Sequence, residues 1–247
     1  MSVSIAGKTH TGKKRSAKTN EDSFFADKIG DVCFAVVCDG MGGAKGGHVA
    51  SSLAVKSFVE TVSELLPESA EYRDILFASA AKANDAVWNT SQNDKSLDGM
   101  GTTAVACIFD GAEYHAVNVG DSRMYLIDEK LGSIAQITKD HSLVQELVDS
   151  GAMTREQAEK SPNKNILMRA LGVGDTVDVD FYRGKYESGI ILLCSDGLYN
   201  YASESDLAQY ISQYEDIERC TDELIAKANE NGGGDNITAV IIRPQGS

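Results

Sequence analysis

Apolar residues along the chain fall into short runs, rich in β-branched and aromatic side chains, that predict β-strands. The predicted strands cover about 2–8, 23–28, 32–38, 102–109, 113–119, 123–128, 134–138, 177–183, 190–194 and 236–242. Turn residues join several of them, because Ile29-Gly30-Asp31 and Asp110-Gly111 stand where hairpins would close. The strands therefore come in antiparallel-looking clusters.

Helical periodicity fills the intervals between these clusters. An apolar stripe from Val49 to Val62 predicts a long helix at about 46–66, and a second is expected at 69–92 with Ser69 as its N-cap. Shorter helices are predicted at 142–150, 154–160, 204–213 and 217–230. Because helices are inserted in pairs rather than alternating with strands, the pattern favours an α+β fold of two antiparallel sheets packed face to face, with helices outside.

Length and composition favour one cytoplasmic domain. The 247 residues are 42% hydrophobic and contain no Pro/Ser-rich linker, so a single domain over 1–247 is expected. The five cysteines are scattered without metal-ligand spacing, which indicates buried thiols in a reducing cytosol. The basic first 20 residues superficially resemble a transit peptide, but a first strand followed by a basic loop is the preferred interpretation.

The charge balance limits the partners that the chain can take. A net charge of −14 argues against a nucleic-acid or anionic-membrane partner. No apolar run approaches the roughly 20 residues that span a bilayer. An excess of carboxylates is, however, consistent with a protein that binds metal cations. Oligomeric state cannot be read from the sequence, and a monomer is the default expectation.

Acidic residues stand where apolar strands end, flanked by glycine or another small residue. These positions are Asp39, Asp121, Asp196 and Asp235, and the acidic pair Glu21-Asp22 precedes a strand. Any one of them alone is ordinary turn chemistry. Together, several carboxylates at the edge of a core would repel one another and take up protons. A bound divalent cation removes that repulsion.

Ligands that are all oxygen atoms favour the hard ions Mg²⁺ and Mn²⁺ over zinc. Gly40, directly after Asp39, would let the backbone approach a cation and present its carbonyl. Two such ions roughly 4 Å apart lower the pKa of a bridging water and neutralise charge on a phosphoryl group. The expected chemistry is hydrolysis by direct attack of a metal-bridging water or hydroxide.

Seven motifs in a fixed order make this expectation specific. They are Asn20-Glu21-Asp22, Asp39-Gly40-Met41-Gly42-Gly43, Gly99-Met100-Gly101-Thr102-Thr103, Val119-Gly120-Asp121-Ser122-Arg123, Arg169-Ala170-Leu171-Gly172, Ser195-Asp196-Gly197-Leu198 and Gly234-Asp235-Asn236-Ile237-Thr238. In this order, from about residue 3 to 243, the chain resembles the metal-dependent protein Ser/Thr phosphatases (type 2C, PPM) in their bacterial single-domain form.

The resemblance implies a four-layer α-β-β-α sandwich with a small flap subdomain at about 142–168. It also implies hydrolysis of phosphoserine and phosphothreonine in proteins, with a cognate Ser/Thr kinase as the opposing partner. Two Mn²⁺ or Mg²⁺ ions would occupy the core site, and their relative preference stays open.

The resemblance assigns ligands position by position. Asp39 would bridge the two ions, and Asp196 and Asp235 would complete the first site. The second site would take Glu21 and the Gly40 carbonyl. Beyond these, Asp22 would lie in the outer shell, and Asp121 together with Asp196 would hold a third, weaker ion.

The position that usually carries the family's phosphate-binding arginine holds no arginine in this chain. In the family it stands four residues before the glutamate of the Asn-Glu-Asp motif, where this chain has Ala17. Arg15 is the first candidate to replace it and Lys18 the second. A lysine supplies charge without the bidentate fork of a guanidinium. A solvated basic loop is the alternative interpretation of the lysines nearby.

The general acid is not identified by the sequence. Met41 occupies the position where eukaryotic members often carry a histidine, and Met cannot donate a proton. His141 is the histidine to consider, although hydrogen bonding or packing is the simpler role just before a helix. His48 reads most simply as part of a helix entry. Arg123 and Arg169 would bind phosphate or pair with carboxylates.

Two other functions remain open at this stage. A two-metal phosphoesterase acting on small phosphorylated metabolites would use the same centre. A non-catalytic phosphoprotein-binding module on the same fold is favoured only by Ala17, since every core acidic position is filled.

Overall fold

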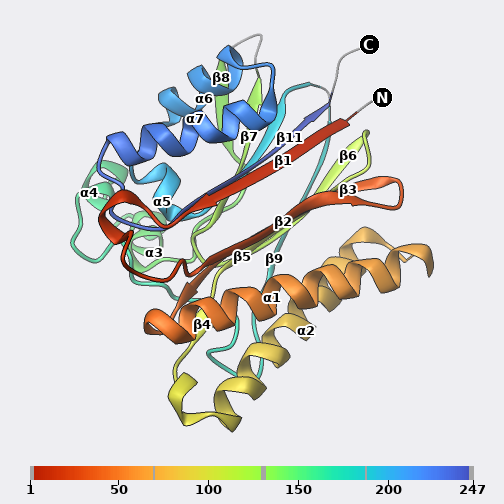
Figure 1. Cartoon of the computed structure of the whole chain (residues 1–247), viewed down its shortest axis with the longest axis vertical. Coiled ribbons are helices and arrows are strands. Elements are labelled where there is room, and N and C mark those ends of the chain that lie inside the picture. The colour runs from red at the N-terminus through yellow and green to blue at the C-terminus, as the bar shows by residue number, and fades with distance from the viewer. Residues whose placement is uncertain (1–2, 69, 129–131, 187, 245–247) are drawn as a thin grey trace.

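The computed structural model describes residues 3–68, 70–128, 132–186 and 188–244, and its strands form two antiparallel sheets packed face to face (Figure 1). The first sheet runs β1 (Val3–His10), β11 (Ile237–Pro244), β10 (Ile190–Cys194), β7 (Arg123–Asp128) and β8 (Ser133–Gln136). The second runs β2 (Asp22–Ile29), β3 (Val32–Met41), β5 (Ala104–Phe109), β6 (Glu113–Val119) and β9 (Asp180–Lys185), with β4 (Gly101–Thr102) pairing to β3. The predicted α+β sandwich is confirmed.

Helices cover the outer face of each sheet and complete the four layers (Figure 1). The second sheet is covered by α1 (Gly43–Leu65) and α2 (Tyr72–Asn93), and the first by α6 (Glu204–Gln213) and α7 (Ile217–Glu230). The short helices are α3 (Leu143–Asp149), α4 (Arg155–Glu159) and α5 (Asp196–Tyr199), and the 3-10 turns are η1 (Lys13–Arg15), η2 (Leu66–Glu68) and η3 (Lys95–Leu97). In the described residues no helix is both long and apolar enough to cross a membrane.

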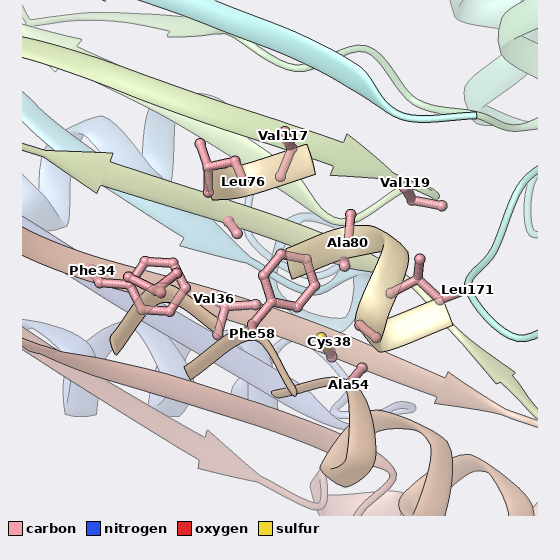
Figure 2. Packing of buried hydrophobic residues seen from close by; sticks show 14 of the residues in the cluster. Phe34, Val36, Cys38, Ala54, Phe58, Leu76, Ala80, Val117, Val119 and Leu171 are labelled. Atoms are coloured by element: carbon pink, nitrogen blue, oxygen red, sulfur yellow. The ribbon is translucent and has the colours of Figure 1, made fainter. Parts of the chain in front are cut away.

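Strand β3 shows why the central strands read as continuous apolar runs. Cys33, Ala35 and Val37 face the first sheet and pack in the core between the two sheets. The alternate residues Phe34, Val36 and Cys38 pack outward against the helices, as Figure 2 shows around Phe58 of α1. Because both faces of the strand are buried, no polar alternation is possible along it.

Several elements differ from the sequence prediction. Strand β3 continues through Asp39 to Met41, and the strand predicted at 102–109 is interrupted at Thr103. The interruption has a cause, since the Thr103 N–H and the Thr102 hydroxyl both donate to the Asp39 carbonyl, at 2.9 Å each. The last strand of the second sheet begins at Asp180 rather than 177, and α5 was not predicted. Ser69 and residue 2, which begins the first predicted strand, lie outside the described residues.

Candidate metal centre

The acidic positions meet at one end of the sandwich, on the side where α3, α4 and α5 lie (Figure 1). Asp39 on β3 stands directly opposite Asp22 on β2 in the antiparallel register. Asp196 is the first residue of α5, directly after β10 and Ser195. Strands from both sheets thus bring their carboxylates to a common edge, as the sequence positions predicted.

Four aspartates form an interacting cluster at this edge. Burial and then the charges of Asp22, Asp196 and Asp121 hold the pKa of Asp39 well above its ordinary value. Burial and then Asp196 and Asp140 raise the pKa of Asp121 to about 8. Burial is also the first cause of the raised pKa values of Asp22, about 6, and of Asp196. The centre is therefore short of positive charge.

Asp22 joins the two sheets below this cluster. Its Oδ2 accepts hydrogen bonds from the Ser195 hydroxyl at 2.7 Å and the Thr238 hydroxyl at 2.6 Å, both on the first sheet's side. The Ser195 hydroxyl in turn accepts from the Thr238 N–H at 3.0 Å. Asp22 therefore fixes the relative position of β2 and the β10–α5 junction, and with it the spacing of Asp39 and Asp196.

Glu21 and the Gly40 carbonyl form a second oxygen pair. The closeness of the two oxygens is shown by Gly47 of α1, because a Cβ on Gly47 would stand 2.5 Å from Glu21 Oε1 and 2.7 Å from the Gly40 oxygen. The backbone of Glu21 is held by Asn236, whose Oδ1 accepts its N–H at 2.8 Å. Only a glycine at position 47 leaves the space between these two oxygens open.

Arg15 occupies a position between two of the predicted ligands. Its Nη2 donates to Glu21 Oε2 at 2.7 Å and its Nη1 to Asp235 Oδ1. The arginine that the sequence suggested for phosphate therefore pairs, in this structure, with carboxylates from both predicted ion sites. Lys18 is exposed, and its N–H closes a turn onto the Arg15 carbonyl at 2.7 Å.

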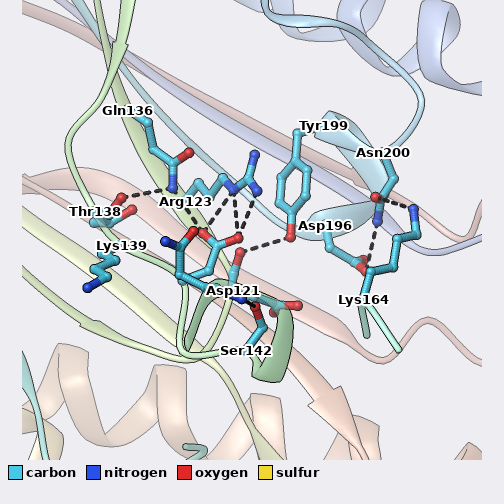
Figure 3. Close-up of polar contacts among 12 residues, drawn as sticks. Asp121, Arg123, Gln136, Thr138, Lys139, Ser142, Lys164, Asp196, Tyr199 and Asn200 are labelled. Carbon is cyan, nitrogen blue, oxygen red and sulfur yellow. Dashed lines mark hydrogen bonds and ion pairs between the residues drawn. The ribbon is translucent and has the colours of Figure 1, made fainter. Parts of the chain in front are cut away.

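Arg123 holds the loop of Asp121 rather than facing open space (Figure 3). Its guanidinium makes a two-pronged ion pair with Asp140, at 2.7 and 2.9 Å, and lies 3.6 Å above the ring of Tyr199. The Tyr199 hydroxyl donates to the Asp121 carbonyl at 3.1 Å. Of the two alternatives for Arg123, pairing with a carboxylate is the one that the structure shows.

Lys164 approaches Asp196 from the predicted flap and was missed by sequence reasoning (Figure 3). Its ammonium donates to Asn200 Oδ1 at 2.8 Å, and the Asn200 amide donates to Asp196 Oδ2 at 3.1 Å. The positive charge of Lys164 lowers the pKa of Asp196 against the larger effect of burial. Only the i, i+4 spacing of Asp196 and Asn200 on one helical turn could have hinted at this contact.

His141 is buried, and both of its ring nitrogens face other parts of the chain. Its Nδ1 accepts the Gly120 N–H at 3.2 Å, and its Nε2 lies 3.3 Å from Asp180 Oδ2. Asp180 is also held by Arg169 at 2.9 Å, so Arg169 too pairs with a carboxylate. This environment favours the hydrogen-bonding role of His141 that the sequence allowed. His48 is exposed on α1.

The residues fit a divalent cation even though no cage is already closed. Within the described ranges, no three His, Cys, Asp or Glu side chains are gathered as ready ligands. Buried oxygens of three carboxylates nevertheless have no hydrogen-bond partner, namely Glu21 Oε1, Asp22 Oδ1 and Asp196 Oδ1. Unpartnered buried carboxylate oxygens are costly, and all-oxygen sets suit Mg²⁺ and Mn²⁺.

Comparison with known proteins gives consistent results. A family model described as protein phosphatase 2C matches residues 7–231. The chain is 37% identical over 240 residues to "Serine/threonine phosphatase stp" of Listeria monocytogenes serotype 4b (strain F2365), covering 95% of this chain and 93% of the relative.

Solved structures agree with the sequence comparison. The crystal structure of serine/threonine phosphatase Stp1 from Staphylococcus aureus superposes with a TM-score of 0.90 at 29% identity, covering 100% of this chain and 96% of that one. The catalytic domain of the serine/threonine protein phosphatase PstP, solved in complex with two manganese ions, has a TM-score of 0.83 at 31% identity and covers 98% of this chain and 97% of that one.

Proposed function

The chain belongs to the protein phosphatase 2C family, and from that premise we propose that its acidic centre hydrolyses phosphoserine and phosphothreonine in proteins with two bound Mn²⁺ or Mg²⁺ ions. As a member of this family, the protein is a Ser/Thr protein phosphatase. The observation that carries the proposal is the cluster of buried carboxylates with unpartnered oxygens at one end of the sandwich.

We propose that Asp39 is shared by the two ions, with Asp196 and Asp235 on one side and Glu21 and the Gly40 carbonyl on the other. Asp121 with Asp196 would take a third, weaker ion. When bound, the ions supply an activated water and neutralise charge on the phosphoryl group. The structure of PstP in complex with two manganese ions supports, by similarity, the proposal of two ions.

The chain's own residues position these ligands. Asp22, anchored to Ser195 and Thr238, keeps the edges of the two sheets together beneath Asp39. Tyr199, held under Arg123, fixes the backbone of Asp121. A centre assembled from both sheets in this way is preorganised by the fold rather than by a single loop.

We propose that Arg15 exchanges its carboxylate partners, Glu21 and Asp235, for the substrate phosphate when metal ions bind. Cations on Glu21 and Asp235 would compete with the guanidinium for the same oxygens, and Arg15 would then turn its two-pronged donor face to the substrate phosphate. The half-buried position of Arg15, between ligands of both proposed sites, supports this role better than the exposed position of Lys18 does.

Replacing Arg15 with Ala should therefore lower kcat/KM for a phosphothreonine peptide by roughly 10–100-fold, mainly through KM, since a charged hydrogen bond contributes about 1.5–3 kcal/mol. Steady-state kinetics at saturating Mn²⁺ would measure it, with Lys18→Ala as the matched control that should change kcat/KM by less than about twofold. A larger loss in Lys18→Ala than in Arg15→Ala would assign the phosphate to the lysine instead.

The cellular setting is also part of the proposal. We propose a monomeric catalytic domain covering the whole chain, with 142–168 as a flap beside the centre, that acts in the cytoplasm against one or more Ser/Thr kinases. The flap assignment is supported by the contact of Lys164 with Asn200. A reducing compartment is supported by the five cysteines, which are all buried and form no disulfide with one another.

Substrate class is the direct test of the proposal. The purified protein with Mn²⁺ would be given a phosphothreonine peptide, a phosphoserine peptide and a sugar phosphate at equal concentration. We expect the peptides to be hydrolysed with at least about tenfold higher kcat/KM, because a peptide adds contacts outside the centre. Preferential hydrolysis of the sugar phosphate would replace the proposal with a small-molecule phosphoesterase.

A further inference from the structure

Exposed apolar side chains are concentrated beside the catalytic centre. Ile166, Met168 and Val173 are the large hydrophobic residues with substantial exposure among the described residues, with 44%, 47% and 52% of their surfaces accessible. All three fall within the single segment 166–173. Scattered exposed apolar residues need no explanation, but a concentration in one segment marks an interaction surface.

One end of this segment is tied to Asp121. The Met168 N–H donates to the His141 carbonyl at 2.8 Å, and the His141 ring accepts the N–H of Gly120, which immediately precedes Asp121. His141 therefore links the backbone of Met168 to the backbone next to Asp121.

The other end is tied to Asp39. Leu171 exchanges two backbone hydrogen bonds with Thr102, at 2.8 and 3.0 Å, and the neighbouring Thr103 N–H donates to the Asp39 carbonyl at 2.9 Å. A Cβ placed on Gly101 would stand 2.9 Å from Met41 Cε and 3.0 Å from Val173 Cγ1. The side chains of Met41 and Val173 thus both approach the same face of Gly101, and Met41 is only two residues beyond Asp39.

The segment is also rigidly supported from beneath. Asn84 of α2 accepts the Gly172 N–H at 2.8 Å and donates to the Gly174 carbonyl at 3.0 Å. Gly172 has a φ of +82°, and a Cβ there would overlap Val87 of α2. The turn before and after Val173 is therefore held in one conformation, which lowers the entropy that binding against it would cost.

From this placement we propose that Met41, Met168 and Val173, with Ile166 at the flap end, form an apolar docking strip for the residues that flank the phosphorylated Ser or Thr of the substrate. The proposal rests on the proposed function, because the segment that carries the strip is hydrogen-bonded toward both Asp39 and Asp121 and so borders the place where a phosphoresidue would bind. The occupant is a substrate segment with apolar side chains beside its phosphoresidue. Acidic flanking residues would be disfavoured by the protein's net charge of −14.

The test compares two phosphothreonine peptides of equal length and charge, one with Leu and Val beside the phosphothreonine and one with Ser and Gln. We expect the wild-type protein to favour the apolar peptide in kcat/KM. Val173→Thr and Met168→Gln should each lower that preference by roughly three- to tenfold, the size expected for covering part of one apolar side chain. Met168 and Val173 are 47% and 52% exposed, so both substitutions are expected to leave the fold intact. Asn165→Gln, a polar exchange at an exposed neighbour, should leave the preference unchanged.

Each other outcome is informative. Equal use of the two peptides by the wild-type protein, or a preference that both substitutions leave intact, would overturn the docking strip while the phosphatase function stood. If the wild-type protein released phosphate from neither peptide, the proposed function itself would fail. A wild-type dimer in light scattering that Val173→Thr dissociates would assign the strip to contact between two copies and overturn its role in substrate binding.

Discussion

Replacing Asp39 with Asn should reduce phosphatase activity by on the order of 10³-fold or more, the effect of losing several kcal/mol of electrostatic stabilisation. The same substitution should raise the thermal unfolding midpoint of the metal-free protein. Burial and the charges of Asp22, Asp196 and Asp121 raise the pKa of Asp39 in the folded state above the value of 3.8 that applies when the chain is unfolded. A carboxyl group with a raised folded-state pKa opposes folding once the pH exceeds its unfolded value.

The pH dependence gives the sign of the stability effect. With chelator at pH 7–8, Asp39→Asn should unfold at a higher temperature than wild type, and the difference should shrink as the pH falls toward about 4. The backbone bonds of Asp39 to Thr102 and Thr103 do not involve its side chain, so the fold is expected to survive. Asp31→Asn, the same exchange at the exposed hairpin end of β3, is the control. If Asp39→Asn were as active as wild type, or unfolded at a lower temperature at pH 8, the proposal that Asp39 is a metal ligand destabilised by neighbouring charges would be contradicted.

Gly47→Ala should inactivate the enzyme although it places a better helix former in α1. In an open helix this exchange is stabilising by up to about 1 kcal/mol. Here the new methyl carbon would stand 2.5 Å from Glu21 Oε1 and 2.7 Å from the Gly40 carbonyl oxygen, between the two oxygens proposed to share an ion. We expect a loss of activity of at least about 100-fold and a much weaker rise of the unfolding midpoint on adding Mn²⁺.

The neighbouring glycine offers a matched control. A Cβ on Gly46 would stand 3.1 Å from the Cβ of Met100, a side-chain contact that can relax by a few tenths of an ångström. Gly46→Ala should therefore keep most of the activity and the full response to Mn²⁺. Wild-type Mn²⁺ affinity in Gly47→Ala, measured by titration calorimetry, would show that the space beside Glu21 holds no ion.

Much of the fold could be predicted because periodicity is a local property. The apolar run at 32–38 predicts a strand whatever packs against it, and the stripe from Val49 to Val62 predicts a helix. The strand break at Thr103 could not be predicted, because it depends on hydrogen bonds to Asp39, which is far away in the sequence. The extension of β3 to Met41 also has a tertiary origin, because Gly40 and Met41 pair with β4.

The acidic residues of the site could be predicted from the sequence, but their partners could not. Aspartates directly after apolar strands indicate a common edge, and the structure brings Asp39, Asp121 and Asp196 together there. The partners of these residues were not predictable, since Lys164 meets Asn200 only through the tertiary fold. The ion pair of Arg15 with Asp235 likewise joins segments 220 positions apart. Sequence patterns identify the ligand candidates, whereas the residues that orient them become visible only in three dimensions.

The measurement that tests the central claim most directly is phosphate release from a phosphothreonine peptide by the purified protein, first with chelator and then with Mn²⁺ or Mg²⁺ restored. Asp39→Asn and Asp196→Asn would be assayed beside it. We expect no release with chelator, recovery with the metal, and no recovery in either variant. Release that persists in chelator, or full activity in both variants, would contradict a phosphatase centre built from these carboxylates.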